Sequence, residues 1–354
     1  MRIAAAVLAL SAGLGAQAQQ AAPPKGDKTD EAIRKGLAFI VSKQDKDGAF
    51  RDRDANLTTM TALGLMALGA VGHQPSDETR EGAAMKKALE FILRTDRQKP
   101  DGYYGEIDGS RMYGHGIITL MLCEMLGMGA DAKMDQQLRD RAKKAVELIL
   151  RSQAVKKDER NRGGWRYTPQ SGDSDLSATV WQVMALRSAR NAGLDVPKEA
   201  IDLAVGYIKR CYHSKRDGRG QPENLKSACG YEPGHGPRYA MAAAGLLSMQ
   251  VCGAYDSPEV RGSADWLADH KINPDEEWFY YGTYYYAQGM FQRGEKHAEQ
   301  ARKLVEELLL ARQQPDGAWS SRHGHENGAG KIYTTALAIL SLAVKHHYLP
   351  IYQR

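Results

Sequence analysis

Two kinds of apolar pattern alternate along the chain, and both have helical spacing. In the first kind, apolar residues recur every three or four positions among Lys, Arg and Glu, as Ile33, Leu37 and Ile40 do. This pattern begins in 31–50, returns in 85–105, 142–153 and 301–321, and has weaker copies that start near Glu199 and Glu259. The spacing predicts six amphipathic helices that recur about every 55 residues.

The second kind of pattern is apolar on all sides of the predicted helix. Its segments are rich in Ala, Leu, Met, Thr and Gly and are nearly free of charge. Six segments share it: Leu57–Val71, Tyr113–Met128, Ser177–Ala192, Arg238–Cys252, Trp278–Arg293 and Ile332–Lys345. A helix that is apolar on every side is buried, so we expect six hairpins, each of one amphipathic outer helix and one buried inner helix.

The ends of the hairpin series decide the fold class. An open row of hairpins would expose its buried helices at both ends, and such rows usually carry polar capping repeats. Neither the first nor the last repeat of this chain is polar in that way. Closure into a ring hides both helix layers, so the sequence predicts an all-α fold, a single (α/α)6 toroid domain over 30–354.

Three of the outer helices end in the pattern Gln-x3-Gly-x-aromatic. The copies run from Gln44 to Phe50, from Gln98 to Tyr104 and from Gln313 to Trp319, and a degenerate fourth copy runs from Gln153 through an insertion to Gly163, Gly164 and Trp165. The Asp-Gly pair inside the motif suits a tight turn with positive φ. We expect the Gln amide to bond the end of a neighbouring helix and the aromatic ring to cover it.

This motif resembles the Gln-Trp repeat of squalene–hopene and oxidosqualene cyclases, a family that shares its toroid with protein prenyltransferase β-subunits. The resemblance extends over nearly the whole chain after its N-terminal segment and implies the toroid fold. Those cyclases carry two helical domains, whereas this chain has repeats for one toroid. The resemblance is therefore more specific for the fold than for the activity.

The first residues of the chain have the pattern of an export signal. Arg2 precedes an apolar run over residues 3–15, and Ala16 and Ala18 form an A-x-A cleavage site. We expect a signal peptide over 1–18 that is cleaved after Ala18, a flexible leader over 19–29, and a secreted or periplasmic protein. No stretch of the sequence reaches the roughly 20 apolar residues that a membrane span needs, so we predict no transmembrane anchor.

Charge and cysteine content narrow the classes further. The chain has 48 Lys and Arg against 43 Asp and Glu, a net charge of +5 that is mixed along its 354 residues, so we expect no nucleic-acid partner. Its 4 cysteines are too few for a disulfide scaffold. Export would allow Cys211 and Cys229, which flank one long loop, to be bridged. Cys123 and Cys252 lie inside apolar helical segments.

The inner helices of such a ring begin at one rim, and the third one is preceded by a candidate acid. The residues Asp173-Ser-Asp175-Leu176-Ser177-Ala resemble the Asp-x-Asp-Asp-Thr-Ala motif of class II terpene cyclases. The resemblance implies that Asp175 protonates an alkene or epoxide and that Asp173 is the first Asp of the motif. The third Asp of the motif is Leu176 here. An Asp just before a helix is also a common N-cap, and that alternative remains open.

Aromatic and basic residues complete the predicted site. On the fifth inner helix, Tyr281 and Tyr285 share one face, and Tyr280 and Tyr284 share another, so we expect only one pair to line the centre of the ring. The expected ligand-binding residues are Tyr113, His115, Trp165, Trp181, His235, Arg238, Tyr281 and Tyr285. Such rings stabilise carbocations or bind sugars, and they can also simply fill a narrow core. We predict no cofactor and no metal site, because no His pair has the i, i+4 spacing of a zinc-binding helix.

Three functions remain open from the sequence. The first is a central pit for an apolar, isoprenoid-like ligand, with acid-initiated cyclase chemistry at Asp175. The second is a polysaccharide lyase or hydrolase on the same ring fold, which a wide polar pit would favour. The third is a binding or scaffold module without catalysis, which a pit filled by the protein's own side chains would favour.

Overall fold

The computed structural model describes residues 27–322, 324–346 and 348–352, so the predicted signal peptide and most of the predicted leader lie outside the described residues. Six outer helices are α1 (Lys28–Ser42), α3 (Arg80–Ile92), α6 (Ala132–Gln153), α8 (Lys198–Cys211), α10 (Pro258–Asp269) and α12 (Glu295–Leu310). Six inner helices are α2 (Leu57–Gly69), α5 (Arg111–Glu124), α7 (Leu176–Asn191), α9 (Tyr239–Val251), α11 (Phe279–Arg293) and α14 (Lys331–Leu342). Four short elements are α4 (Gly105–Asp108), α13 (Gly324–Ala329), η1 (Ala343–Lys345) and η2 (Pro350–Tyr352).

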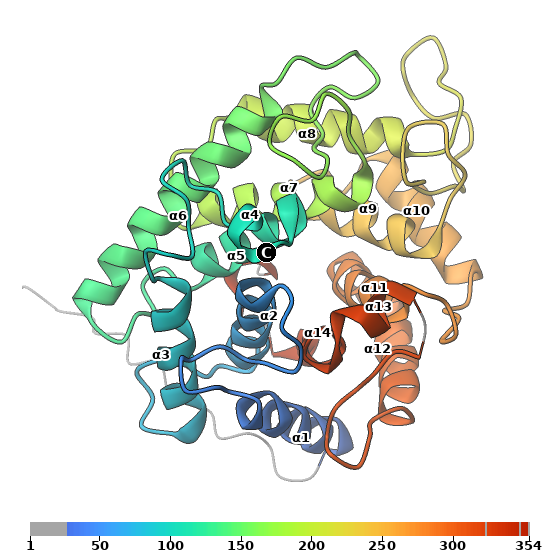
Figure 1. Ribbon diagram of the computed structural model, residues 1–354. Helices are drawn as coiled ribbons and strands as arrows, with labels where there is room; N and C mark the ends of the chain where they lie inside the picture. Colours follow the sequence, from blue (N-terminus) through green and yellow to red (C-terminus); the bar gives the residue numbers. More distant parts are fainter. Residues whose placement is uncertain (1–26, 323, 347, 353–354) are drawn as a thin grey trace, which may run out of the picture.

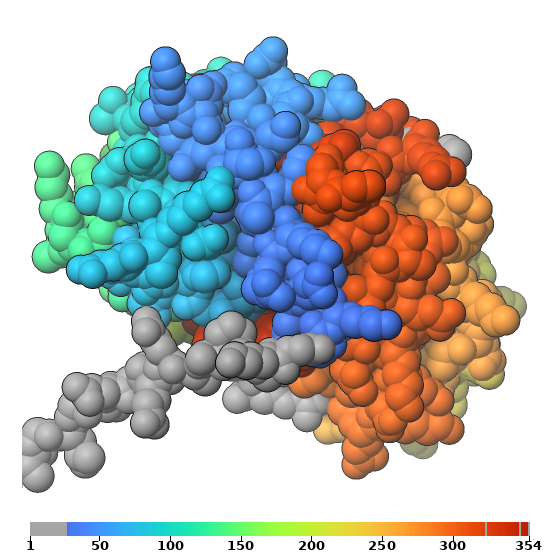
Figure 2. All heavy atoms as spheres, turned by 90° about the horizontal axis from the view of Figure 1, so that it is seen from below, coloured from blue at the N-terminus to red at the C-terminus, as the bar shows by residue number. Residues whose placement is uncertain are grey.

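The helices form a closed double ring, as the sequence predicts. The inner helices surround the centre and the outer helices form the perimeter (Figure 1). Each inner helix packs against the next one along the chain, and α14 packs against α2, so the inner ring closes on itself. On the perimeter, the first outer helix contacts the last one, because α1 packs against α12. Seen from below, the N-terminal and C-terminal parts of the chain lie side by side (Figure 2).

The two hydrophobic patterns correspond to the two helix layers. In α1, Ile33 and Leu37 are buried while Arg34 and Lys35 are exposed, as an amphipathic perimeter helix requires. In α2, all residues after Leu57 are buried. The inner helices begin and end within a few residues of the predicted bounds, and α1 begins at Lys28, two residues before the predicted domain start. None of the described helices is long and apolar enough to cross a membrane.

The Gln motif joins an outer helix to the next one at four places in the ring. The side-chain amide of Gln153 donates to the carbonyl oxygen of Gly163 in its own motif at 3.0 Å and to that of Ala200 in α8 at 2.9 Å. The equivalent bonds from the other copies run from Gln44 to Ala84, from Gln98 to Arg141 and from Gln313 to Ala32. The last of these bonds joins α12 to α1, so the same device that links neighbouring hairpins also closes the ring.

The glycine of the motif allows this close approach between helices. Gly163 has φ +88°, and a Cβ atom at this position would lie 2.2 Å from the carbonyl oxygen of Leu203 in α8. Any other residue would therefore be strained and would push the loop away from the next outer helix. The glycines of the other three copies have φ between +86° and +99° and meet a carbonyl of the next outer helix in the same way.

The aromatic residue of the motif is held by the inner helix of its own hairpin. The backbone N–H of Trp165 donates to the Thr179 hydroxyl at 3.0 Å, and the indole N–H donates to the carbonyl oxygen of Ile149 in α6 at 2.9 Å. In the same way, the Thr61 hydroxyl accepts the backbone N–H of Phe50, and the Thr335 hydroxyl accepts that of Trp319. The motif thus joins one inner helix and two outer helices.

We expect Gln153→Ala to lower the free energy of unfolding by about 3 kcal/mol, because two buried carbonyl oxygens would each lose the hydrogen bond from the Gln153 amide. Gln136→Ala is the matched control: Gln136 is an exposed residue of the same helix and bonds only Asp140. Urea unfolding followed by far-ultraviolet circular dichroism measures both variants. Equal midpoints for the two variants would show that the Gln bridge does not hold neighbouring hairpins together.

Candidate functional site

Carboxylates cap the buried N-termini of several inner helices at one rim of the ring. The Asp108 side chain accepts the backbone N–H of Thr58 in α2 at 2.7 Å, and Glu326 accepts that of Tyr281 in α11 at 2.8 Å. Asp52 caps α14 in the same way. In all three cases the carboxylate belongs to a different hairpin from the helix that it caps. These acids satisfy helix ends that are shielded from water, which is a structural role.

Asp175 caps its own helix, α7, and is completely buried. Its side chain is 0% exposed. Oδ1 accepts the Ser177 hydroxyl at 2.6 Å and the Ala178 backbone N–H at 2.8 Å. Oδ2 lies 3.2 Å from Nε of Arg166. Burial raises the pKa of Asp175, although the bonds from Ser177 and Ala178 and the charge of Arg166 act in the opposite direction.

Arg166 is the centre of a charged group at the mouth of the ring. Besides Asp175, its guanidinium pairs with Glu232 at 2.6 Å and, more loosely, with Asp173 at 3.6 Å. The Arg166 side chain is 21% exposed, Glu232 24% and Asp173 60%. The pair of predicted catalytic acids is thus divided: Asp175 lies inside the protein and Asp173 in solvent. Arg166 also lies over the rings of Tyr167 and Tyr231.

Tyrosine hydroxyls connect the helix starts around this group. The hydroxyl of Tyr113, near the start of α5, is hydrogen-bonded to that of Ser177 in α7. The Tyr113 ring stacks on Tyr167, whose hydroxyl is bonded to that of Tyr231. We use the name rim cluster for Tyr113, Arg166, Tyr167, Asp175, Ser177, Tyr231 and Glu232. The rim cluster brings together residues from three hairpins.

Aromatic side chains fill the centre of the ring below the rim cluster. Trp181 of α7 stacks on Tyr284 at 5.9 Å between ring centroids and also contacts Tyr281 and Tyr285 of α11. These four side chains are less than 5% exposed, so little solvent-filled space adjoins them. The expectation that only one tyrosine pair lines the centre is therefore wrong, because Tyr284 of the second pair joins Tyr281 and Tyr285 there. Tyr280 instead donates to the carbonyl oxygen of Ser320.

The C-terminal segment η2 packs onto the aromatic centre at the far ends of the inner helices. The Tyr352 hydroxyl is bonded to that of Tyr284, and the Ile351 backbone N–H donates to Glu124 at the last position of α5 at 3.1 Å. The Glu124 carboxyl also accepts the Ser188 hydroxyl. Burial raises the pKa of Glu124 to about 7. This end of the ring is closed by the protein's own chain.

Several predicted ligand-binding residues have side chains that are not part of the rim cluster. His115 is fully buried; its two ring nitrogens contact the backbone N–H of Tyr104 and the carbonyl oxygen of Ala145, and burial lowers its pKa to about 4. It thus occupies the place that Thr61, Thr179 and Thr335 have in other hairpins. The Trp165 indole points to α6, although its backbone pairs with Asp175. His235 and Arg238 are exposed near the start of α9.

The cysteines are present as thiols in this structure. Cys211 and Cys229 are both buried and are not joined to each other, although the neighbouring Tyr212 forms a β-bridge with Cys229. Burial raises the pKa of Cys211 to about 12, so its thiol is protonated and unreactive at neutral pH. Cys123 is buried, and Cys252 is half-buried.

Sequence reasoning did not find Arg166, Glu232, Tyr167 or Tyr231 as parts of the site. One signal for Arg166 is present in the repeat: an Arg follows the motif aromatic here and also at Arg51 after Phe50. Arg51 pairs with Asp45 and Asp54 in its own loop. The two tyrosines and Glu232 lie in long loops whose paths no periodic pattern predicts.

Trp278 provides an exposed aromatic surface next to the rim cluster. Its side chain is 43% exposed although the rest of this aromatic run is buried. The indole stacks on the His325 ring at 5.4 Å and contacts Tyr281, whose hydroxyl reaches the backbone carbonyl of Ser177 at 3.5 Å. His325 is paired with Glu277, and its hydrogen bonds hold the pKa of the Glu277 carboxyl below its usual value. Trp278 is therefore connected to the rim cluster through Tyr281.

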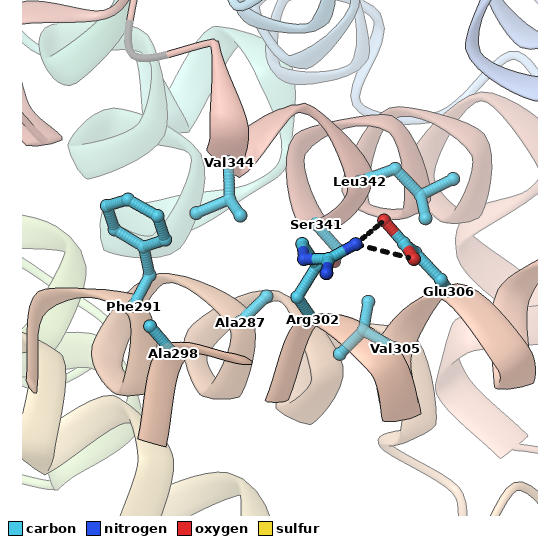
Figure 3. Close-up of a pocket in the computed structure, with 9 residues that line it drawn as sticks. All are labelled: Ala287, Phe291, Ala298, Arg302, Val305, Glu306, Ser341, Leu342 and Val344. Carbon is cyan, nitrogen blue, oxygen red and sulfur yellow. Dashed lines mark hydrogen bonds and ion pairs between the residues drawn. The ribbon is translucent and has the colours of Figure 1, made fainter. Parts of the chain in front are cut away.

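A small pocket between α11, α12 and α14 is too small to hold a ligand (Figure 3). It is lined by Phe291, Val305 and Val344, among others, and is crossed by the ion pair between Arg302 and Glu306. Its volume of about 10 Å³ has room for about one water molecule. This pocket is therefore not the candidate site.

Comparison with known proteins supports the ring fold and leaves the chemistry open. No protein-family model matches the sequence, and no curated protein matches it. Among solved structures, an inactive variant of the α-1,6-mannanase GH76A of Salegentibacter sp. HEL1_6, in complex with α-1,6-mannotetrose, is similar with TM-score 0.64 and 12% identity over 91% of this chain and 100% of that one. The type II terpene cyclase MstE from Scytonema has TM-score 0.57 and 15% identity over 91% of this chain and 99% of that one.

A third structural neighbour is again a sugar enzyme. The cellobiose 2-epimerase from Spirochaeta thermophila has TM-score 0.61 and 12% identity over 90% of this chain and 96% of that one. At such low identity these similarities establish the α/α toroid alone. The expected likeness to the cyclase toroid is supported at this coarse level, and toroids that act on sugars resemble this chain as well.

Glu326 makes the stability of the rim dependent on pH. Burial raises its pKa from 4.5 to about 7, although bonds from the N–H groups of Tyr281 and Tyr280 favour the anion. In the unfolded chain the carboxyl would ionise near pH 4.5, so the neutral form favours folding at low pH. This contribution is lost as pH rises through about 7.

The free energy of unfolding of the original protein is expected to fall between pH 5 and pH 8.5. We expect this fall to be smaller in Glu326→Gln, by up to about 3 kcal/mol. Urea unfolding at several pH values measures this slope for both proteins. The variant can be less stable at pH 5, because an amide replaces one acceptor oxygen, but its profile is expected to be flatter. Parallel profiles would refute the assignment of this dependence to Glu326.

Proposed function

We propose that the protein is a carbohydrate-active protein that holds an oligosaccharide at the rim cluster and Trp278. The centre is filled by the protein's own side chains, as expected of a binding module, and is not the wide polar pit expected of a polysaccharide lyase or hydrolase. The observation that carries this proposal is therefore the contrast between the closed centre and the accessible rim. Trp181, Tyr284 and Tyr285 fill the centre and are almost fully buried, whereas Trp278, Arg166 and Glu232 remain partly exposed above them. A ligand that binds without rearrangement of the core would meet the rim first.

The chemistry of the rim fits a sugar. Carboxylate and guanidinium groups form strong hydrogen bonds with hydroxyl groups, and Arg166 and Glu232 present both kinds together. The apolar faces of a sugar ring pack on aromatic rings, and Trp278 offers such a ring to solvent, backed by His325. Export of the chain after cleavage at Ala18, which we propose from the sequence, would bring it to extracellular glycans.

A second function is favoured by the burial of Asp175. An acid that protonates an alkene has to stay protonated in an apolar site, and burial raises the pKa of Asp175. Acid-initiated cyclisation of an isoprenoid is therefore our second proposal. It requires Trp181, Tyr284 and Tyr285 to move, because they occupy the space that an apolar chain would need. Mass spectrometry of lipids that co-purify with the protein tests it directly.

The test of the first proposal measures binding and turnover of α-1,6-mannotetraose and cello-oligosaccharides. We expect Trp278→Ala to weaken binding of the bound oligosaccharide at least about tenfold, the effect of about 1.4 kcal/mol. Trp266→Ala is the matched control, because Trp266 also stacks on a histidine, His270, but lies on the outer helix α10. This control is expected to bind like the original protein.

Asp175→Asn separates an active site from a passive one. We expect it to reduce turnover at least about a hundredfold if Asp175 takes part in proton transfer. Asp131→Asn is the control, since Asp131 is likewise an N-cap but belongs to the outer helix α6. Failure of the original protein to bind either oligosaccharide class, or equal binding by both tryptophan variants, would refute a sugar site at this rim.

A further inference from the structure

Asp175 cannot itself touch a ligand in this structure. Its side chain is 0% exposed, and both oxygens are engaged, one by Ser177 and Ala178 and the other by Arg166. Tyr113, by contrast, is partly exposed, and its hydroxyl is bonded to the Ser177 hydroxyl. Any proton that passes between Asp175 and a ligand therefore needs an intermediate group. Ser177 and Tyr113 form a continuous path from Asp175 toward the surface.

The donors and acceptors along this path can be put in order. With its second oxygen beside Arg166, the Asp175 carboxylate accepts hydrogen bonds, so the Ser177 hydroxyl donates to it. A hydroxyl has one proton, and the Ser177 oxygen must then accept from Tyr113. The order is Tyr113 to Ser177 to Asp175. The phenol oxygen keeps lone pairs that no bond within this path uses.

We propose that Tyr113 is the residue that takes a proton from the ligand and that Ser177 relays it to Asp175. The ligand proton bonds to the Tyr113 oxygen as the phenol proton moves to the Ser177 oxygen and the Ser177 proton moves to Oδ1 of Asp175. One proton leaves the ligand and one arrives at Asp175, while Tyr113 and Ser177 end unchanged. The reverse transfer returns the proton and restores the carboxylate, so the path serves acid and base steps alike.

The groups around the path keep its direction. Arg166 favours the ionised form of Asp175 before transfer and remains paired with Glu232 afterwards. Tyr281 donates to the backbone carbonyl of Ser177 and not to its hydroxyl, so it does not compete with Tyr113. Tyr167 stacks on the Tyr113 ring, and its own hydroxyl is bonded to Tyr231. The identity of the ligand rests on the proposed function, but the order of the path does not.

The path can be tested without a substrate. Carbon-13 labelling of the tyrosine Cζ atoms, with Tyr113→Phe to assign its signal, reports hydrogen bonding and ionisation of Tyr113 by nuclear magnetic resonance. We expect Asp175→Asn to lower the pH at which the Tyr113 signal titrates, because the nearby negative charge disfavours the phenolate. Ser177→Ala should shift the signal at neutral pH, and Ser177→Thr, which keeps the hydroxyl, should restore it. A Tyr113 signal that none of these variants moves would overturn the path.

Kinetics tests the role of the path in turnover of an oligosaccharide. Tyr113→Phe and Ser177→Ala are each expected to lower kcat at least about a hundredfold with little change in the Kd of the oligosaccharide, and Ser177→Thr to recover most of kcat. Tyr280→Phe is the control, because that hydroxyl bonds Ser320 away from the path. Full turnover by Tyr113→Phe would refute the relay and leave the sugar site standing. Absence of oligosaccharide binding in the original protein would refute the proposed function, whereas the resonance experiment would still decide the path.

Discussion

The burial of the inner helix ends is the constraint on which this structure depends. A helix leaves its first N–H groups without partners, and an inner helix of a closed ring has little water near its end to satisfy them. Here carboxylates bond these groups: Asp108 at α2, Glu326 at α11 and Asp175 at α7. A ring of buried helices therefore gathers acidic side chains at one rim for structural reasons. Their presence there is not in itself a sign of catalysis.

Asp175 differs from the other caps in its surroundings and not in its capping geometry. Asp108 and Glu326 bond groups of a neighbouring hairpin, and Asp108 bonds Thr59 as well. Asp175 instead has a guanidinium on one oxygen and a hydroxyl path on the other. One carboxylate can thus hold a helix end and exchange protons, because its Oδ1 accepts two separate donors. The Ala178 N–H belongs to the helix end, and the Ser177 hydroxyl belongs to the path. The two readings of this residue that the sequence left open are compatible.

The fold could be predicted because its signals are local and repeated. The alternation of amphipathic and wholly apolar segments predicted the helix layers, and the Gln motif predicted that a Gln amide bonds a neighbouring helix, as Gln313 bonds Ala32 of α1. The site was predicted only in part. Asp175 and Tyr113 stand at helix starts, which periodicity locates, but Arg166 and Glu232 stand in loops whose meeting depends on the closed ring.

Residue type alone also misled the prediction of the site. His115 has the chemistry of a catalytic group, yet it fills a place that threonine fills in other repeats and bonds only the backbone. Comparing positions between repeats would have shown this, because Thr61, Thr179 and Thr335 align with it. Tyr284 also joins the centre, although it lies on the other helical face from Tyr281. The indole of Trp181 is wide enough to contact the tyrosines of both faces.

The bond between Gln313 and Ala32 has a consequence for how the protein is made. It joins residues 281 positions apart, so it can form only after nearly the whole chain has left the ribosome. Until then, the first hairpin has no partner on one side, and the apolar faces of α1 and α2 that later meet α12 and α14 stay uncovered. Contacts of such long sequence separation slow folding, and exposed apolar faces favour aggregation. In a chain of this design, the earliest hairpin is therefore the part that stays open to aggregation for longest during synthesis.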